Sequence, residues 1–466
     1  MYTFSKRLKI VSILLFVVGA IGWGTSYVAS HGLTLEDVKT LLAEENSHHG
    51  AEASHGEETT DTDHHNVQTD EEAHAAMIHS THDSDAHAED THEADAHHDD
   101  AHAEHVLHQM HNRPYAALYI AAFFFFMISL GVLAFYAIQY AAQAGWSPVL
   151  FRVMEAITYY VLPGGLIVLV IALWADDHIF IWMDPEVVAH DALIQAKSGW
   201  LDKSWFAIRG LIFITGWSLY RYFSRKFSLA QDLADVNDNS NFKKNFRISA
   251  GFLVFYIYTE SMMSWDWIMS LDPHWFSTLF GWYVLATFMV SAVTVIAMVT
   301  VYFQSKGYLD FVNDSHIHDL AKFMFGFSIF WTYLWFSQFM LIWYSNIPEE
   351  VTYFITRIED YNLPFFGMVV MNFVFPLLIL MNSDYKRINY FIVMAGIVII
   401  LGHYMDVFNM IMPSAVGDQW FIGAAEIGGF LFFLGLFIFV VFKELTKAPL
   451  LAEGDPYMGE SERFHY

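Results

Sequence analysis

Residues 115–142 read YAALYIAAFFFFMISLGVLAFYAIQYAA, an uncharged run that decides the class of fold. A helix needs about 20 apolar residues to cross a bilayer core about 30 Å thick, and this run exceeds that length. The chain of 466 residues is 55% hydrophobic and only 16% charged, which is too apolar for a water-soluble protein. We therefore predict an all-α membrane protein with ten transmembrane helices. The ten apolar runs cover residues 8–29, 115–142, 149–175, 204–222, 247–270, 279–303, 319–345, 364–382, 388–412 and 421–442.

The distribution of Lys and Arg predicts the orientation, because these residues are retained on the cytoplasmic side of a membrane. With the N-terminus inside, the inner segments hold sixteen Lys and Arg, whereas the outer segments hold five. Both termini are then cytoplasmic. The first run follows a short basic leader without a convincing small-residue cleavage site, so we expect a retained helix and not a signal peptide.

A weak internal repeat predicts how the helices are grouped. The segments MSWDWIMSLDP (263–273) and HYMDVFNMIMP (403–413) each have an Asp seven residues before a Pro. This match favours two four-helix bundles, helices 2–5 and 6–9, in parallel repetition and flanked by helices 1 and 10. The predicted parts are the first transmembrane helix (1–29), an outer, periplasmic loop (30–112), the first bundle (113–270), the second bundle (271–413), the tenth helix (414–443) and a cytoplasmic tail (444–466).

Within the outer loop, residues 46–112 hold sixteen His and seventeen Asp and Glu but no Lys or Arg, which accounts for most of the formal net charge of −27. The stretch HDSDAHAEDTHEADAHHDDAHAEH (82–105) repeats a His at every fifth position. Such a period advances each side chain by about 140° around a helix, so the histidines share no metal-binding face. We expect a disordered, weakly metal-binding or pH-responsive segment and no specific metal site.

The chain has no cysteine, which excludes disulfides, thiolate-ligated iron–sulfur clusters and covalently attached haem within it. A membrane b-type haem commonly needs two histidines at matched depth, and only His403 lies well inside a predicted helix. We therefore expect no redox cofactor bound by this chain. A redox role would have to run through a bound quinol, such as menaquinol or ubiquinol, or through a neighbouring subunit.

Ionisable residues inside the predicted helices are functional candidates, because charged groups are costly in a bilayer. His403 and Asp406 share one helix face, and Glu426 lies at similar depth on the next helix. We interpret them as proton-handling groups, with an ion-paired core as the alternative, and Glu155 as the group that receives protons from the cytoplasm. The predicted proton pathway comprises Glu155, Glu260, Asp319, Lys322, His403, Asp406 and Glu426.

A second set of ionisable residues lies at the outer ends of the predicted helices. For Arg209 a purely structural role, in an ion pair with Glu260 or Asp266, is as consistent with the sequence as a functional one. The set consists of Asp176, Asp177, His178, Arg209 and Asp266.

The segment YTESMMSWDWIMSLDPHWFSTLFGWYVL (258–285), with the ten helices and the long loop after the first one, resembles the NrfD-like integral membrane subunits of alternative complex III. GHYMDVFNMIMP (402–413) supports the resemblance, which covers residues 113–443 and the first helix. It implies a subunit of a respiratory quinol:cytochrome c oxidoreductase in a bacterial inner membrane. The implied partners are an iron–sulfur subunit, c-type cytochromes that carry haem, and a paralogous NrfD-like subunit, with lipids around them and no nucleic acid.

In this family quinol is oxidised at the outer end of the first four-helix bundle. By position, the resemblance assigns that role here to Asp176, Asp177, His178, Arg209 and Asp266. The site is usually assigned to the paralogue, so the resemblance favours assembly and proton conduction as the contribution of this chain. Two alternatives stay open: a structural paralogue whose charges are paired off, and a self-contained proton-coupled transporter.

Overall fold

The computed structural model describes residues 2–53, 91–235 and 237–465, and among these residues it contains helices but no strand. This confirms the predicted all-α class. Two compact units are distinguished, Met1–Ser30 with His111–Tyr466, and His31–Met110. The long helices are α1 (Lys6–His31), α2 (Leu35–Ala53), α4 (Thr91–Ala142), α6 (Val161–Trp174), α10 (Lys203–Asp232), α11 (Ser240–Trp267), α12 (Phe280–Gln304), α13 (Asp314–Ser345), α14 (Pro348–Glu359), α17 (Asn389–Val416) and α18 (Ala424–Glu444). The short ones are α5 (Phe151–Ile157), α7 (Asp176–Ile179), α8 (Pro185–His190), α9 (Ala192–Ala196), α15 (Asn362–Val369), α16 (Phe375–Leu380) and α19 (Met458–Glu462).

Each of the ten predicted apolar runs lies mainly in helices, and eight helical segments of the described residues are long and apolar enough to cross a membrane. The runs 204–222 and 247–270 lie largely in α10 and α11. These two helices are long enough to cross a membrane, but they contain more charged and polar residues than the eight segments do. The eight segments are Lys6–His31, Asp100–Ala142, Pro148–Trp174, Phe280–Gln304, Asp314–Ser345, Asn362–Leu380, Asn389–Val416 and Ala424–Glu444.

The part of α4 that begins at His111 forms the centre of the first unit. The Tyr119 hydroxyl donates a hydrogen bond of 2.8 Å to the carbonyl of Trp267 in α11. The Phe124 and Phe125 rings pack against α17 and α18 on another side, at 5.3 Å from Tyr404 and 5.5 Å from Phe437 between ring centroids. The phenylalanine-rich run that predicted a membrane helix is thus buried against helices from both halves of the chain.

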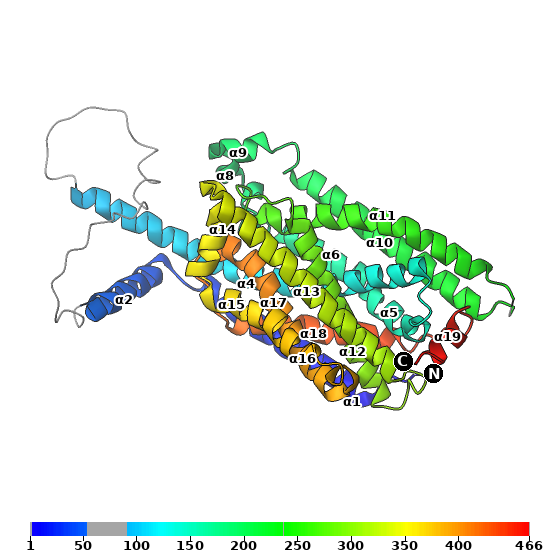
Figure 1. Ribbon diagram of the computed structural model, residues 1–466. Helices are drawn as coiled ribbons and strands as arrows, with labels where there is room; N and C mark the ends of the chain where they lie inside the picture. The colour runs from blue at the N-terminus through cyan, green and yellow to red at the C-terminus, as the bar shows by residue number, and fades with distance from the viewer. Residues whose placement is uncertain (1, 54–90, 236, 466) are drawn as a thin grey trace. The chain divides into compact units, whose positions relative to one another are not determined.

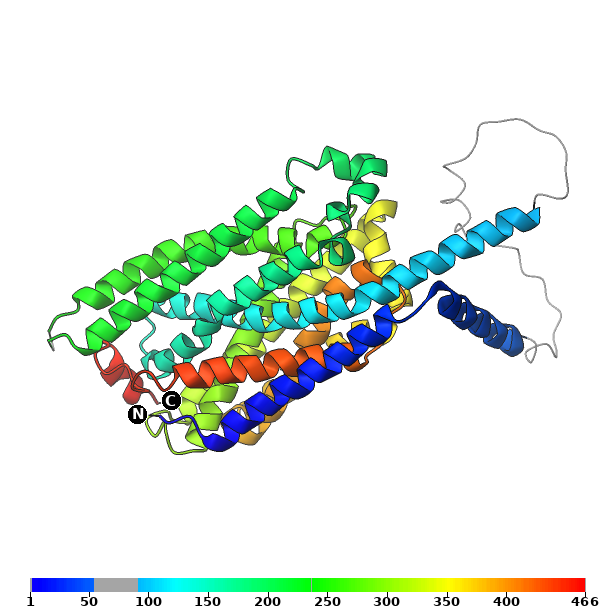
Figure 2. The same cartoon turned by 180° about the vertical axis from the view of Figure 1, so that it is seen from behind.

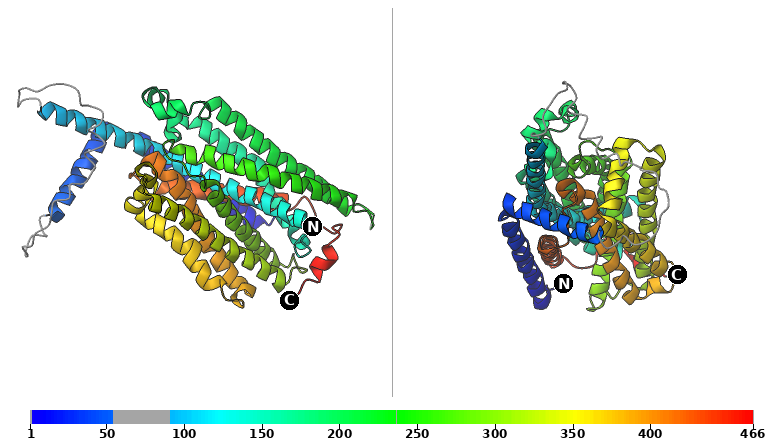
Figure 3. Two further views of the ribbon diagram at one scale, coloured as in Figure 1. Left: turned by 45° about the horizontal axis from the view of Figure 1, so that its top comes forward. Right: turned by 90° about the vertical axis from the view of Figure 1, so that its left-hand side faces the viewer.

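The other helices of this unit pack around α4 in two groups (Figures 1 and 3). Helices α6, α10 and α11 lie together, and α12 packs with α13 and α17. Contacts between α11 and α12 join the two groups. Both chain ends lie at the same end of the unit (Figure 1).

Helix α1 runs beside α18 (Figure 2), where glycines allow the two backbones to approach closely. A Cβ atom at Gly19 would collide with the backbone of Phe432, and one at Gly428 would collide with the backbone of Trp23. Small residues at such crossings are a common basis of helix packing in membranes, because apolar burial gives little driving force there.

The second unit contains helical residues that the sequence analysis placed in the outer loop. Val38 of α2 is buried with Ala103 and Val106 of α4, and Lys39 pairs with Asp100. Residues 46–53 and 91–112, which we predicted to be disordered, are therefore helical. The reason is a short apolar stripe on each helix, which the dominant His and acidic composition obscures. Most of the His repeat at 82–105 lies outside the described residues or has no described side chains.

Candidate functional site

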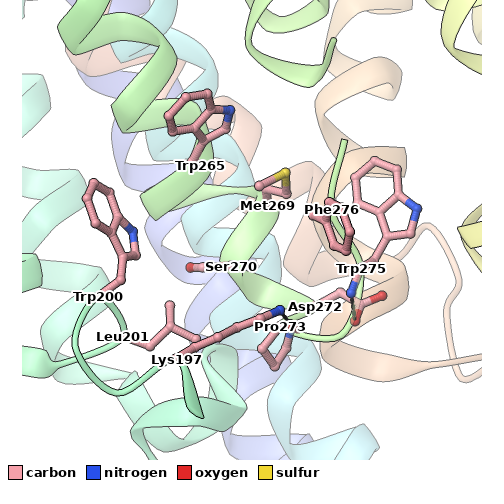
Figure 4. A pocket seen from close by; sticks show the side chains of 10 residues that line it. All are labelled: Lys197, Trp200, Leu201, Trp265, Met269, Ser270, Asp272, Pro273, Trp275 and Phe276. Carbon is pink, nitrogen blue, oxygen red and sulfur yellow. Dashed lines mark hydrogen bonds between the residues drawn. The ribbon is translucent and has the colours of Figure 1, made fainter. Parts of the chain in front are cut away.

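A cavity of about 310 Å³ lies where the connection before α10 meets the segment after α11. In Figure 4 the rings of Trp200 and Trp275 stand on opposite sides of it, with Trp265 and Met269 at one end and Lys197 at the other. The Lys197 ammonium donates to the carbonyl of Pro273 at 2.5 Å. The full lining is Lys197, Trp200, Leu201, Trp265, Met269, Ser270, Asp272, Pro273, Trp275 and Phe276. A volume of this size, with aromatic walls and few polar groups, suits a planar ring ligand.

Trp200 connects the cavity to a buried ion pair at the end of α11. Its indole N–H donates to Asp266 Oδ1 at 2.7 Å. Arg209 donates from Nε to Asp266 Oδ2 at 2.6 Å and from Nη2 to Oδ1 at 3.0 Å, and its guanidinium lies 4.2 Å from the Trp200 ring. This two-point, charge-assisted geometry fixes the carboxylate in orientation. Of the two partners that the sequence allowed for Arg209, the structure selects Asp266.

The rim of the cavity is held by a contact between the connection before α10 and the segment after α11. His274 Nε2 lies 2.6 Å from Asp191 Oδ2, and the Asp191 carboxylate also caps α9. Hydrogen bonds from the Ile194 backbone N–H, and then the contact with His274, hold the pKa of Asp191 below its usual value. The connection that contributes Lys197 is therefore tied to the segment that contributes Pro273.

The other three predicted quinol residues lie apart from the cavity lining. Asp176 pairs with Lys203, and Asp177 is largely exposed with His178 Nε2 at 3.9 Å from its Oδ1. The His178 ring stacks on Tyr115, with 4.2 Å between ring centroids. Of the five residues in the prediction, the structure thus brings only Arg209 and Asp266 together next to the cavity.

His403 and Asp406 share one face of α17, as predicted, and are fully buried. Asp406 accepts hydrogen bonds from the hydroxyl of Tyr283, from Thr287 at 2.8 Å and from the Trp331 indole at 2.8 Å. His403 Nδ1 is 3.4 Å from Asp406 Oδ2, and its Nε2 has no hydrogen-bond partner within the described residues. Asp406 is thus surrounded by neutral donors.

Glu426, the third member of the predicted outer proton group, is tied to Arg113. Arg113 donates from Nε to Oε1 at 2.8 Å and from Nη2 to Oε2 at 2.7 Å, and the backbone N–H of Gly423 donates to Oε2 at 2.8 Å. Glu426 therefore caps the start of α18 and joins it to α4. This geometry favours a structural role for its carboxylate.

Glu155, the predicted inner proton acceptor, lies in a buried network of charges and is 2% exposed. Arg152 and Arg225 donate to its Oε2 at 2.6 and 3.1 Å, and the Tyr136 hydroxyl donates to its Oε1 at 3.0 Å. The Ser224 hydroxyl lies 3.4 Å from that of Tyr136. A polar path therefore leads from α5 through α4 to α10.

The C-terminal tail covers this network, which the sequence did not indicate. The backbone N–H of Gly454 donates to Asp232 Oδ1 at 3.1 Å, and Arg152 pairs with the same Asp232 carboxylate. Burial raises the pKa of the neighbouring Asp455 to about 6, and the negative charge of Asp232 adds to the rise. A titratable carboxyl of the tail thus lies beside the charged network.

The remaining predicted proton groups differ in environment. Both carboxylate oxygens of Glu260 are buried in α11 without a hydrogen-bond partner among the described residues. Asp319 and Lys322 form the predicted pair, with 2.8 Å between Oδ1 and Nζ, and Lys322 is half exposed. Burial of a polar group without a partner is costly, so packing alone does not account for Glu260.

No protein-family model matches this chain, and no curated protein matches it either.

Proposed function

We propose that the chain is a membrane subunit of a respiratory quinol:cytochrome c, or quinol:oxidase, oxidoreductase complex in a bacterial inner membrane. Within the NrfD-like subunits of alternative complex III, the chain would correspond to the subunit called ActF. The chain would cross the membrane ten times, in two four-helix bundles flanked by helices 1 and 10, with both termini cytoplasmic. Partner subunits would supply the iron–sulfur clusters and haem c, and a paralogous NrfD-like subunit would lie beside it.

The observation that carries the proposal is the aromatic cavity next to the Arg209–Asp266 pair. A quinol head group is a planar ring with polar groups on opposite edges, and oxidation releases its protons. Aromatic walls suit the ring, and Lys197 is a donor placed at the cavity for a ring oxygen. Trp200 joins the wall to a carboxylate, so a ligand that moves Trp200 changes the hydrogen bonding of Asp266. Menaquinol and ubiquinol both belong to this ligand class.

Buried titratable groups support a second contribution, the movement of protons. His403 Nε2 and the Glu260 carboxyl have no hydrogen-bond partner among the described residues, although buried polar groups are normally paired. Glu155 begins a polar path at the inner end. In the proposed route Glu155 receives protons from the inside, and His403 with Asp406 passes them outward.

Binding of a short-chain quinone to the purified protein tests the first part, with quenching of tryptophan fluorescence as the readout. Lys197→Met removes an ammonium donor and should weaken binding about fivefold, as expected for one hydrogen bond of about 1 kcal/mol. Trp200→Phe makes one aromatic wall smaller and removes its hydrogen bond to Asp266, so it should also weaken binding. The matched controls Trp205→Phe and Lys203→Met change the same residue types outside the cavity lining. Equal weakening by the controls, or no weakening by either cavity variant, refutes the ring site.

Proton movement is tested separately in the reconstituted complex, by measuring protons released per electron transferred. His403→Gln and Asp406→Asn should lower this ratio, while Asp310→Asn, in an exposed connection, should leave it unchanged. Normal turnover with unchanged proton release in the first two variants excludes the route.

A structural paralogue is the second candidate, and the Arg113–Glu426 pair favours it. In this pair a predicted proton group joins two helices, which supports a structural role for it. In that case His403→Gln would lower the thermal stability of the protein. The folded fraction would still release the normal number of protons per electron transferred. The third class, a self-contained transporter, would be identified by transport activity without co-purifying haem or iron–sulfur subunits.

A further inference from the structure

A groove with a volume of about 410 Å³ runs between α10 and α11. Its lining residues recur every three or four positions, so each helix contributes one continuous face. The α10 face includes Gly216, Phe223 and Phe227, and the α11 face includes Ile248, Gly251 and Phe255.

The groove exists because glycine stands where a larger side chain would fill it. No atom lies within 4 Å of a Cβ built at Gly251, so the space beside this residue is open. The surrounding surface is also apolar, with Leu219, Phe223 and Val254 all about half exposed or more. An open apolar channel in an apolar surface suits a hydrocarbon chain better than a polar ligand.

Basic side chains gather at the end of the groove near the connection between α10 and α11. Lys226, Lys243, Lys244 and Arg247 are all exposed there. Lys244 Nζ lies 5.9 Å from the ring centroid of Phe227, a residue of the groove wall. The pKa of Asp238 is lowered by hydrogen bonds to Ser240 and then by the charges of Lys244 and Lys243, as expected in a positive field.

The length of the groove matches one leaflet of a bilayer. From Gly216 to Phe227 a helix rises by about 16 Å, and half of a hydrocarbon core about 30 Å thick is about 15 Å. A lipid with its head group at the basic end would therefore place one acyl chain along the whole groove. We propose that the groove between α10 and α11 is a binding site for an anionic phospholipid, with its phosphate at Lys244 and one acyl chain packed across Gly251.

This inference rests on the proposed function in one respect, the placement of α10 and α11 in the membrane, but not on quinol or proton chemistry. Its test is therefore lipid binding. The full chain is purified, exchanged into mixed micelles with either dioleoyl phosphatidylglycerol or dioleoyl phosphatidylcholine, and examined by native mass spectrometry for retained lipid. Quinone binding by the same samples is measured in parallel, so failure of the lipid site is distinguishable from failure of the quinone site.

Gly251→Leu places an apolar side chain in the groove, with no atom within 4 Å of its Cβ position, and should abolish retention of phosphatidylglycerol. Gly326→Leu is the matched control, since Gly326 is also an exposed helical glycine with no atom within 4 Å of its Cβ position and lies outside the groove. Lys244→Gln should lower retention of phosphatidylglycerol about fivefold but leave phosphatidylcholine unchanged, as expected for one charge worth about 1 kcal/mol near a membrane surface.

Lys306→Gln serves as the control for the head-group variant, because Lys306 Nζ lies at a similar distance, 5.7 Å, from the Tyr302 ring. The proposal is overturned if Gly251→Leu does not reduce retention of phosphatidylglycerol. It is also overturned if the native chain retains phosphatidylglycerol and phosphatidylcholine equally. If a neighbouring protein subunit covers Gly251 in the intact complex, the proposal is also overturned, because the groove is then a protein interface.

Discussion

Asp455 provides a quantitative prediction about the C-terminal tail. Its side chain is 8% exposed and lies near Asp232, Arg152 and Glu155. Burial is the main cause that raises its pKa from 3.8 to about 6, and Asp232 adds to the rise, while the Tyr457 backbone N–H and Arg152 oppose it. In the released tail the same carboxyl would be exposed and would return to its ordinary pKa.

The sign of the pH dependence follows from this difference. Because the pKa of Asp455 is higher in the docked tail than in the released tail, protonation favours docking. The stabilisation is complete below the released-state value of 3.8 and is lost as the pH rises through about 6. At about 1.4 kcal/mol per tenfold change in acidity, the difference amounts to about 3 kcal/mol at most. The docked tail should therefore be less stable at pH 7.5 than at pH 4.5.

Hydrogen–deuterium exchange of residues 446–465 in the purified full chain measures this effect, after correction for intrinsic exchange. In the native chain, docking should weaken about 25-fold between pH 4.5 and 7.5, or by about 2 kcal/mol, because at pH 4.5 the carboxyl of the released tail is already mostly ionised. Asp455→Asn should remove most of this pH dependence and slow exchange at pH 7.5. The control Glu453→Gln changes an exposed carboxyl of the same tail and should behave as the native chain. An unchanged pH profile in Asp455→Asn refutes the reasoning.

Three further substitutions address the packing of the helices. Glu426→Gln removes the charge partner of a buried Arg113 and should lower the free energy of unfolding by about 3 to 5 kcal/mol, measured by thermal unfolding in detergent, whereas the exposed Glu349→Gln should have little effect. Gly428→Leu should displace α1 from α18, because its side chain meets the α1 backbone, and a loss of α1 protection in proteolysis would reveal it. Tyr136→Phe removes one hydrogen bond to Glu155 and should cost about 1 kcal/mol of stability, so an unchanged unfolding temperature would contradict the geometry.

The positions of the helices were largely predictable from the sequence, because a membrane helix needs a continuous run of apolar residues and such a run is visible in the sequence itself. The run at 364–382 forms α15 and α16, joined by a π-helical turn at Val370–Val374 that no pattern of apolar residues indicates. Helix α2 was missed because its apolar positions Val38 and Leu42 are few and are followed by acidic residues. The sequence therefore predicted the helices that a long apolar composition specifies. It did not predict a helix whose packing depends on a few contacts.

The partners of the candidate residues were much less predictable. Arg113 and Glu426 are 313 positions apart, and the sequence analysis placed Arg113 at the start of the first bundle without assigning it a partner. The sequence analysis gave Tyr283 and Trp331 no role, yet both donate a hydrogen bond to Asp406. Pairing of i and i+3 residues, as in Asp319 and Lys322, was predictable because helix geometry alone fixes it. Contacts between helices depend on packing, which a single sequence does not reveal.

The two aspartates of the internal repeat show how similar positions acquire different chemistry. Asp266 and Asp406 each accept an indole N–H, from Trp200 at 2.7 Å and from Trp331 at 2.8 Å. Asp266 is also held by the guanidinium of Arg209, and removing either charge would leave the other buried without its partner. Asp406 instead accepts hydrogen bonds from neutral donors, and His403 Nδ1 lies 3.4 Å from its Oδ2. The repeat therefore places an ion-paired carboxylate beside the ring-sized cavity and a carboxylate with neutral hydrogen-bond donors in the other group of helices, a difference that agrees with the division of roles in the proposed function.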